Sequence, residues 1–219
     1  MKVFLKKAAE IANLCIDFIE EELKNERIKE KELTRALKKK IYSLGGRLSF
    51  KPIVTCGKRS AAIHPKPTSK IIKGVGYVDF GASYKGYKSD VTVPFVKGEI
   101  GKEEMKIVKT VLRAYELVKK KLKLGVPVWK LFYDVDVFLR KKGYMMKHAL
   151  GHGIGKRVHE KPNISLKSGP EVKIEKGMFF TIEPGIYVKD LCGCRIEDVF
   201  FADKNGIKKL TNSRLIIIK

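Results

Sequence analysis

The sequence predicts a mixed fold of the α+β or α/β class, built as one compact unit. Helical and strand-like patterns alternate along all 219 residues, and 44% of the residues are hydrophobic, which is ample for a core. A plan of two helices followed by strands occurs twice, and Gly45 and Gly143 end the second helix of each set. Because these glycines are separated by nearly half of the chain, the sequence favours an internal duplication.

The first half begins with an amphipathic helix over residues 4–23, where apolar residues recur every three to four positions. A second helix runs through Leu33, Leu37 and Ile41 and is ended by Gly45. Strands are predicted at residues 48–50, 53–55, 75–79 and 87–95, and the stretch up to Pro67 is expected to be irregular.

The second half repeats this plan with a long helix over residues 103–124, which the Gly125-Val126-Pro127 segment breaks. A shorter helix follows over residues 129–139, and short strands come after it. If the halves are related by a pseudo-twofold axis, their polar motifs converge at the interface between them. Such interfaces are favoured places for binding pockets.

An acidic hairpin is the main polar feature of the first half. Strand-forming residues on both sides of segment 83–86 predict two antiparallel strands joined by a four-residue loop. With this loop Asp79 lies directly opposite Asp90, and both side chains are on one face. Like charges placed in this way repel, so a cation is expected between them. The alternative is an ordinary hairpin whose acids pair with lysines.

The second half supplies further polar groups. His152 lies in a glycine-rich segment, His159 follows it, and Glu183 and Glu197 each lie in a short apolar strand. A buried carboxylate is costly unless it is paired or bound to a metal. Four carboxylates and one imidazole can hold two divalent ions, whose charges they balance, with a water between them held as hydroxide. All the histidines of the chain lie in motifs of this kind: His64, His148, His152 and His159.

Together these segments resemble the pita-bread metallopeptidases, the family of methionine aminopeptidase, aminopeptidase P and prolidase (Xaa-Pro dipeptidase). The matching segments have the family's order and spacing: D-F-G-A-x-Y-x-G-Y-x-S-D-V-T, H-x-L-G-H-G-I-G-x-x-V-H-E-x-P, T-I-E-P-G-I-Y and R-I-E-D-V. The resemblance covers nearly the whole chain. It implies an α+β pita-bread fold, with two pseudo-symmetric halves whose helices cover a curved antiparallel sheet. It also implies one catalytic domain over residues 1–219, with no separate N-terminal domain.

The resemblance implies a role for each site residue. The metal ligands are expected to be Asp79, Asp90, His152, Glu183 and Glu197. Hard oxygen ligands suit Mn²⁺ or Co²⁺, with Fe²⁺ and Zn²⁺ as alternatives. Glu183 would also act as general base and acid. His64 would donate to the scissile amide or the developing oxyanion, and His159 would contact the substrate carbonyl. His148 and Arg195 are expected on the substrate side, or holding the ligands.

The implied activity is that of a dinuclear exopeptidase, which hydrolyses the N-terminal peptide bond of a peptide substrate. The R-I-E-D-V-F and T-I-E-P-G-I-Y segments resemble the proline-specific branch, so cleavage of Xaa-Pro bonds is predicted first and methionine removal second. Two features depart from that branch. Its members normally carry an N-terminal domain, and Thr92-Val93-Pro94 stands where Thr-Arg-Thr is usual. An alternative of another class is a non-catalytic homologue that binds ribosomes or nucleic acid, against which the intact ligand set argues.

The formal charge of +23, with a pI near 9.8, comes mostly from lysines spread over the helices. Lysines without stacking aromatics favour a solvated face over base recognition, although weak attraction to polyanions or ribosomes is consistent with this charge. The scattered cysteines, including Cys192 and Cys194, are expected to be free thiols. The sequence has no apolar run of 18 residues and no signal peptide, so we expect a cytoplasmic protein without a membrane partner. It predicts no oligomeric state.

Overall fold

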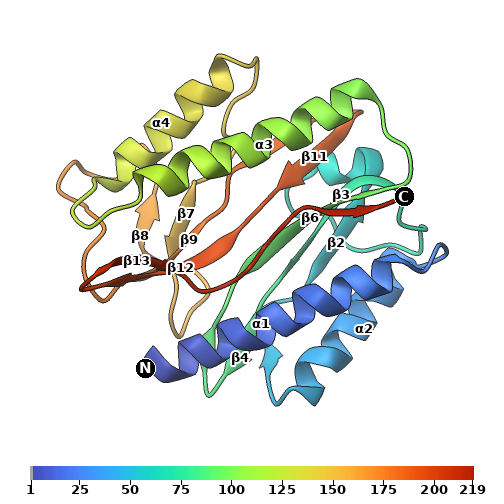
Figure 1. Ribbon diagram of the computed structural model, residues 1–219, viewed down its shortest axis with the longest axis horizontal. Helices are drawn as coiled ribbons and strands as arrows, with labels where there is room; N and C mark the ends of the chain where they lie inside the picture. Colours follow the sequence, from blue (N-terminus) through green and yellow to red (C-terminus); the bar gives the residue numbers. More distant parts are fainter. Residues whose placement is uncertain (1) are drawn as a thin grey trace.

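Four α-helices form two pairs in the computed structural model, which describes residues 2–219. The pairs are α1 (Lys2–Leu23) with α2 (Glu30–Ser43), and α3 (Lys102–Lys121) with α4 (Val128–Arg140). In Figure 1 the two pairs lie on opposite sides of a central set of strands. The helices predicted from apolar periodicity are therefore confirmed, with ends that differ by only a few residues.

A four-stranded sheet forms the centre of the first half, in the order β14-β6-β3-β2. Its strands are β2 (Ile53–Cys56), β3 (Gly74–Phe80), β6 (Val91–Lys97) and β14 (Ile216–Ile218). Neighbouring strands are antiparallel except for β14 and β6, which are parallel. A smaller antiparallel sheet beside it is formed by β1 (Arg47–Leu48), β4 (Ala82–Tyr84) and β5 (Tyr87–Lys88).

The register of the acidic hairpin differs from the prediction. The connection between β4 and β5 is the two-residue turn Lys85-Gly86, whose φ angles of 51° and 83° are both positive. Two-residue hairpin turns of this kind match the twist of the strands that they join. Asp79 therefore pairs with Thr92, and the predicted direct pairing with Asp90 is wrong. Because the shift is by two residues rather than one, Asp90 stays on the same side of the hairpin as Asp79.

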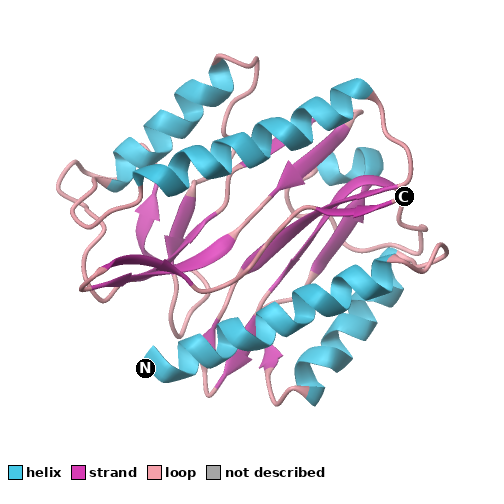
Figure 2. Ribbon diagram, viewed as in Figure 1, coloured by secondary structure: helices cyan, strands magenta, loops and turns pink. Residues whose placement is uncertain are grey.

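The second half contains a five-stranded sheet in the order β13-β12-β9-β7-β8. Its strands are β7 (Gly151–Gly153), β8 (Glu160–Ile164), β9 (Phe179–Ile182), β12 (Asp198–Asp203) and β13 (Gly206–Lys209). Between β9 and β12 the chain forms a separate antiparallel hairpin of β10 (Gly185–Val188) and β11 (Cys192–Arg195). Figure 2 shows the strands of both halves between the helix pairs, which confirms the α+β architecture.

The two glutamates of this half lie at strand ends, whereas the sequence predicted them inside strands. Glu183 follows the last residue of β9, and Glu197 lies between β11 and β12. Side chains within a strand alternate between the two faces of the sheet, and a residue at a break is not bound to that alternation. Glu197 also joins the two halves, because its backbone N–H donates to the Thr92 carbonyl at 3.0 Å.

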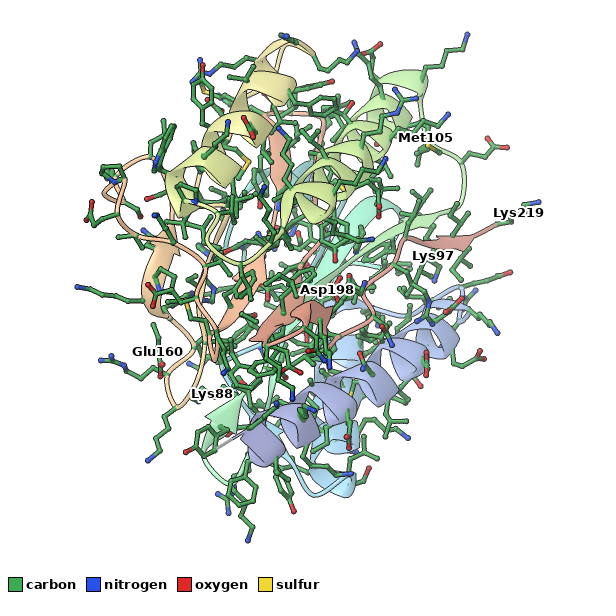
Figure 3. The ribbon with its side chains drawn as sticks, turned by 60° about the vertical axis from the view of Figure 1, so that its left-hand side comes forward. Lys88, Lys97, Met105, Glu160, Asp198 and Lys219 are labelled. Carbon is green, nitrogen blue, oxygen red and sulfur yellow. The ribbon has the colours of Figure 1, made fainter. Side chains whose placement is uncertain are left out.

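Each half has its own apolar core between its helix pair and its sheet. One cluster includes Ile16 and Leu37 from the first helix pair, and the other includes Val111 and Phe180 from the second half. Full burial of each such side chain contributes roughly 1.5–3 kcal/mol to folding. Asp198 lies near the middle of the molecule in Figure 3 and is fully buried. It accepts hydrogen bonds from side chains of α3, β13 and the C-terminal segment: Tyr115, Lys209 and Thr211.

Two further expectations concern the state of the cysteines and the absence of a membrane span. Within residues 2–219 the four cysteines are free and buried: Cys15, Cys56, Cys192 and Cys194. This confirms the expectation of free thiols. Among the described residues, every helix is too short or too polar to cross a membrane.

Candidate metal centre

Two pairs of acids, one from each half, meet at the centre of the molecule. Asp79 near the end of β3 and Asp90 just before β6 flank the β4–β5 hairpin. Glu183 just after β9 and Glu197 just before β12 flank the β10–β11 hairpin in the same way. Each of the antiparallel strand pairs, β3–β6 and β9–β12, therefore carries two carboxylates at one of its ends. Oxygen atoms of Asp79, Asp90 and Glu197 lie within 4.8 Å of one another.

His152 extends this cluster from β7. One of its ring nitrogens and oxygens of Glu183 and Glu197 also lie within 4.8 Å of one another. Its Nδ1 lies 3.0 Å from the carbonyl of Gly153, to which it can donate. That bond leaves a lone pair on Nε2, which faces oxygens of Asp90 at 3.6 Å and Glu183 at 3.7 Å. A lone pair aimed at ionised carboxylates is repelled by them, and a divalent cation between these groups would remove that repulsion.

Burial also changes the pKa values of the groups in the cluster. Burial raises the pKa of Asp90 and Glu197 well above the ordinary range, and the neighbouring acids raise both further. Burial raises the pKa of Glu183 to about 8. Burial also lowers the pKa of His152 to about 4, so the imidazole is neutral at pH 7. A neutral imidazole among buried acids that repel one another is a set of groups that divalent cations stabilise.

Two buried oxygens support this interpretation. Asp79 Oδ1 and Glu197 Oε1 have no hydrogen-bond partner within residues 2–219. A buried acceptor without a partner costs roughly 1–3 kcal/mol, and more when it is charged. The donor set of carboxylate oxygens and one imidazole nitrogen suits Mn²⁺, Co²⁺, Fe²⁺ or Zn²⁺. The residues present therefore fit divalent metal ions.

Arg195, the last residue of β11, holds the acids of both halves. It is only 2% exposed, and its Nη2 donates to Asp79 Oδ2 at 2.5 Å. Its Nε donates to Thr92 Oγ1 at 3.0 Å, and the Thr92 hydroxyl donates to Glu197 Oε2 at 2.8 Å. Its Nη1 donates to the hydroxyl of Tyr187 at 2.7 Å. Burial acts to lower the pKa of Arg195, but Tyr187 and Asp79 outweigh it, so the guanidinium stays charged.

His148 joins the same network from the second half. Its Nε2 lies 2.9 Å from the Tyr187 hydroxyl, and its Nδ1 lies 2.7 Å from the carbonyl of Ala149. Burial lowers the pKa of His148 to about 4, so the ring is neutral. Its Nδ1 is also 3.7 Å from Glu183 Oε2. Both ring nitrogens of His148 thus have partners within the protein.

The sequence interpretation assigned no role to Thr92 or Tyr187. Both lie in segments that resemble the metallopeptidase motifs, and this position is the one sequence feature that points to a role for them. Their task depends on Arg195, and the bond between Arg195 and Thr92 joins residues 103 positions apart. Local sequence cannot show such a contact.

The remaining histidines lie around two hollows beside the cluster. His64 and His159 are both exposed, and the His159 ring centroid is 4.3 Å from that of His152. One cavity of about 280 Å³ is lined by the acids and by apolar side chains: Phe50, Ile53 and Val158. A second hollow of about 490 Å³ is lined by basic side chains, Arg157 and Lys161. Four residues line both: His64, His152, His159 and Glu183.

Comparisons with known proteins give one consistent result. The model of metallopeptidase family M24 matches residues 4–204. An uncharacterized peptidase of Methanocaldococcus jannaschii is 36% identical over an alignment of 217 residues, and the match covers 96% of this chain and 62% of that protein.

Solved structures agree with this match. A prolidase from Pyrococcus furiosus has a TM-score of 0.90 and is 33% identical, over 96% of this chain and 63% of that one. The chain thus spans less than two thirds of the length of these two relatives. A methionine aminopeptidase from Rickettsia prowazekii has a TM-score of 0.84 over 96% of both chains. At 18% identity, that likeness shows the fold alone.

Proposed function

The chain belongs to metallopeptidase family M24, and from this premise we propose that it is a dinuclear exopeptidase. It hydrolyses the N-terminal peptide bond of peptides, with a preference for Xaa-Pro bonds. The observation that carries the proposal is the meeting of two acid pairs and the neutral His152 in one buried cluster with unpartnered oxygens. We also propose that residues 1–219 form one catalytic domain.

The five ligands divide between two ions. One ion would be held by Asp79, Asp90 and Glu197, and the other by His152, Glu183 and Glu197, so Glu197 is common to both groups. Asp90 also lies in a group with His152 and His159. Bound there, Mn²⁺ or Co²⁺, with Fe²⁺ or Zn²⁺ as alternatives, would lower the pKa of a water nucleophile and polarise the scissile carbonyl. Arg195 positions the acids, because it contacts Asp79 directly and Glu197 through Thr92.

Glu183 is the proposed general base and acid. Its side chain is 17% exposed, compared with 3% for Glu197, and it lines both hollows. A carboxylate in this position can take the proton of the attacking water and pass it to the leaving amine.

The histidines divide into two roles. His64 and His159 are exposed side chains of the cavity wall. We propose that His64 donates a hydrogen bond to the scissile amide or the developing oxyanion and that His159 contacts the substrate carbonyl. His148 and Arg195 use their polar nitrogens on protein partners. We therefore propose that these two orient the ligands rather than bind the substrate, the second of the two roles expected from the sequence.

Support for the Xaa-Pro preference comes from the similarity to the Pyrococcus furiosus prolidase. Methionine removal remains the second candidate, because the methionine aminopeptidase shares only the fold. The complete ligand set argues against a non-catalytic homologue. The attraction to polyanions and the cytoplasmic location stay predictions.

Treatment with a chelator, followed by addition of Mn²⁺ or Co²⁺, tests the proposal. Cleavage of Ala-Pro and longer Xaa-Pro peptides should appear only after the metal is restored, and Met-Ala-Ser should be cleaved more slowly. Faster cleavage of Met-Ala-Ser would favour the methionine-specific alternative. No cleavage of any peptide, together with RNA binding that weakens steeply with salt, would contradict the enzyme reading.

A further inference from the structure

The segment that carries His64 has little regular structure of its own. It begins with η1 (Gly57–Ala61), a 3₁₀ helix, and continues without helix or strand to residue 70. His64 is an exposed side chain in the middle of this segment, and it lines both hollows beside the acid cluster. A catalytic side chain needs a fixed position, so contacts elsewhere must hold this segment.

Glu30, the first residue of α2, ties the two ends of the segment together. Its acidic side chain is fully buried. One oxygen, Oε1, accepts a hydrogen bond from the backbone N–H of Cys56 at 3.2 Å. The other, Oε2, accepts from both the backbone N–H and the hydroxyl of Thr68, each at 2.7 Å. A single carboxylate therefore binds both Cys56, just before η1, and Thr68, twelve positions later.

Arg59 closes a smaller ring within this clamp. Its Nε lies 3.6 Å from Glu30 Oε2, and its Nη2 donates to the carbonyl of Lys66 at 2.5 Å. The loop from residue 59 to residue 66 is thus closed at its base, with His64 inside it. On the side nearer the acids, the hydroxyl of Tyr77 donates to the carbonyl of Ala62 at 2.7 Å.

Capping of α2 does not explain Glu30. The carboxylate of Glu32 already accepts the backbone N–H of Lys29 at 3.2 Å, as in a capping box. The backbone N–H of Glu30 itself is satisfied by the carbonyl of Lys70. Burial of a carboxylate is costly, and here the hydrogen bonds that offset the cost all come from residues 56–68.

We propose that Glu30 is a positioning residue for His64, and that the contacts of Glu30 with Cys56, Arg59 and Thr68 fix the place of that histidine over the metal centre. This inference rests on the proposed function, because it assigns His64 to the reaction. Glu30 lies on a helix of the first pair and takes no part in the acid cluster.

Glu30→Gln tests the clamp with almost no change of side-chain volume. The amide nitrogen of the glutamine must face hydrogen-bond donors, either at Cys56 or at Thr68, and the attraction to Arg59 is lost. We expect kcat for Ala-Pro to fall up to ~100-fold, since small misplacements of catalytic groups have effects of this size. KM and Mn²⁺ affinity should stay near the wild-type values. Thr68→Val, which removes one hydroxyl donor, should give a smaller fall of the same kind.

A double mutant separates positioning from general destabilisation. Because Glu30 acts through His64, Glu30→Gln added to His64→Ala should lower kcat little below that of His64→Ala alone. Leu37→Ala is the control, since Leu37 is buried in the same helix outside the clamp, and it should lower Tm but leave kcat unchanged. Losses that multiply in the double mutant, or an equal fall of kcat in the control, would overturn the proposal.

Hydrogen exchange tests the clamp independently of activity. Amides of residues 57–68 should exchange faster in Glu30→Gln, while those of α3 and α4 stay unchanged. If the metal-loaded wild type cleaves no peptide, the proposed function fails, and the exchange result still decides whether the clamp exists. If the wild type is active but exchange in residues 57–68 is unchanged in Glu30→Gln, the clamp is contradicted and the peptidase assignment stands.

Discussion

The two halves of the molecule place their acids in the same way, on both sides of a β-hairpin, but the hairpins themselves make different contacts. Lys88 ends β5 two residues before Asp90, and Arg195 ends β11 two residues before Glu197. Lys88, labelled in Figure 3, nevertheless donates to the carbonyl of Ser49 in its own half. Arg195 is buried and reaches Asp79 in the other half.

The surroundings of the two hairpins explain this difference. The β4–β5 hairpin packs against the start of α1, where the ring of Phe4 lies 6.2 Å from Tyr84 and 5.9 Å from Tyr87. The β10–β11 hairpin packs instead against η1 and β3, and the Gly193 N–H donates to Ser60 Oγ at 2.8 Å. The repeated part of the fold thus builds the acid cluster, and the part that differs supplies the side chain that orients it.

The largest effect is expected when one acid of either half is removed. Asp79→Ala and Glu183→Ala should each weaken Mn²⁺ binding and lower kcat/KM by at least ~1,000-fold, because metal ions supply several kcal/mol of transition-state stabilisation. Metal titration and peptide assays measure both. Glu175→Ala, at an exposed acid, is the control. Near-normal turnover in Glu183→Ala would contradict its role as a ligand and base.

The comparison of hairpins is tested by substitutions at their equivalent ends. Arg195→Lys cannot contact Asp79, Thr92 and Tyr187 at once, because an ammonium lacks the planar fork of a guanidinium. We expect metal affinity or activity to fall by roughly 10–100-fold, as for other residues that orient metal ligands. Lys88→Ala should change both by less than about twofold. Similar losses in the two variants would show that the halves do not differ in the proposed way.

The smallest expected effect is on stability and depends on pH. In the metal-free protein, burial raises the pKa of Glu183 from 4.5 to about 8, so the folded state keeps a proton that the unfolded chain releases. That stabilisation is complete below the unfolded value and is lost as pH rises through the folded one. The pKa of His152, lowered by burial from 6.5 to about 4, has the opposite effect on stability, but only below 6.5.

Between pH 6.5 and 8 the acids therefore dominate. The free energy of unfolding of the metal-free protein should fall by up to ~1.4 kcal/mol per pH unit for each acid that titrates. Bound Mn²⁺ holds the acids ionised and should remove most of this slope. Urea unfolding with and without Mn²⁺ measures the difference, and equal slopes would count against a shared metal site.

The helices and the candidate ligands were predictable because their signals are local. Periodicity defined α1 through α4, and the polar residues within apolar segments pointed to Asp79, Asp90, Glu183 and Glu197. The hairpin register was not predictable, since it depends on the positive φ of Lys85, a conformation that is uncommon for non-glycine residues. The roles of Thr92 and Glu30 depend on contacts distant in sequence, so motif spacing could not reveal them.

Side chains from both halves are proposed to hold two metal ions together. Anomalous diffraction from crystals grown with Mn²⁺ tests this most directly. Two peaks are expected within the acid cluster, one beside Asp79 and Asp90, one beside His152 and Glu183, and both beside Glu197. A single peak contacted by one half only, or peaks outside the cluster, would contradict the account.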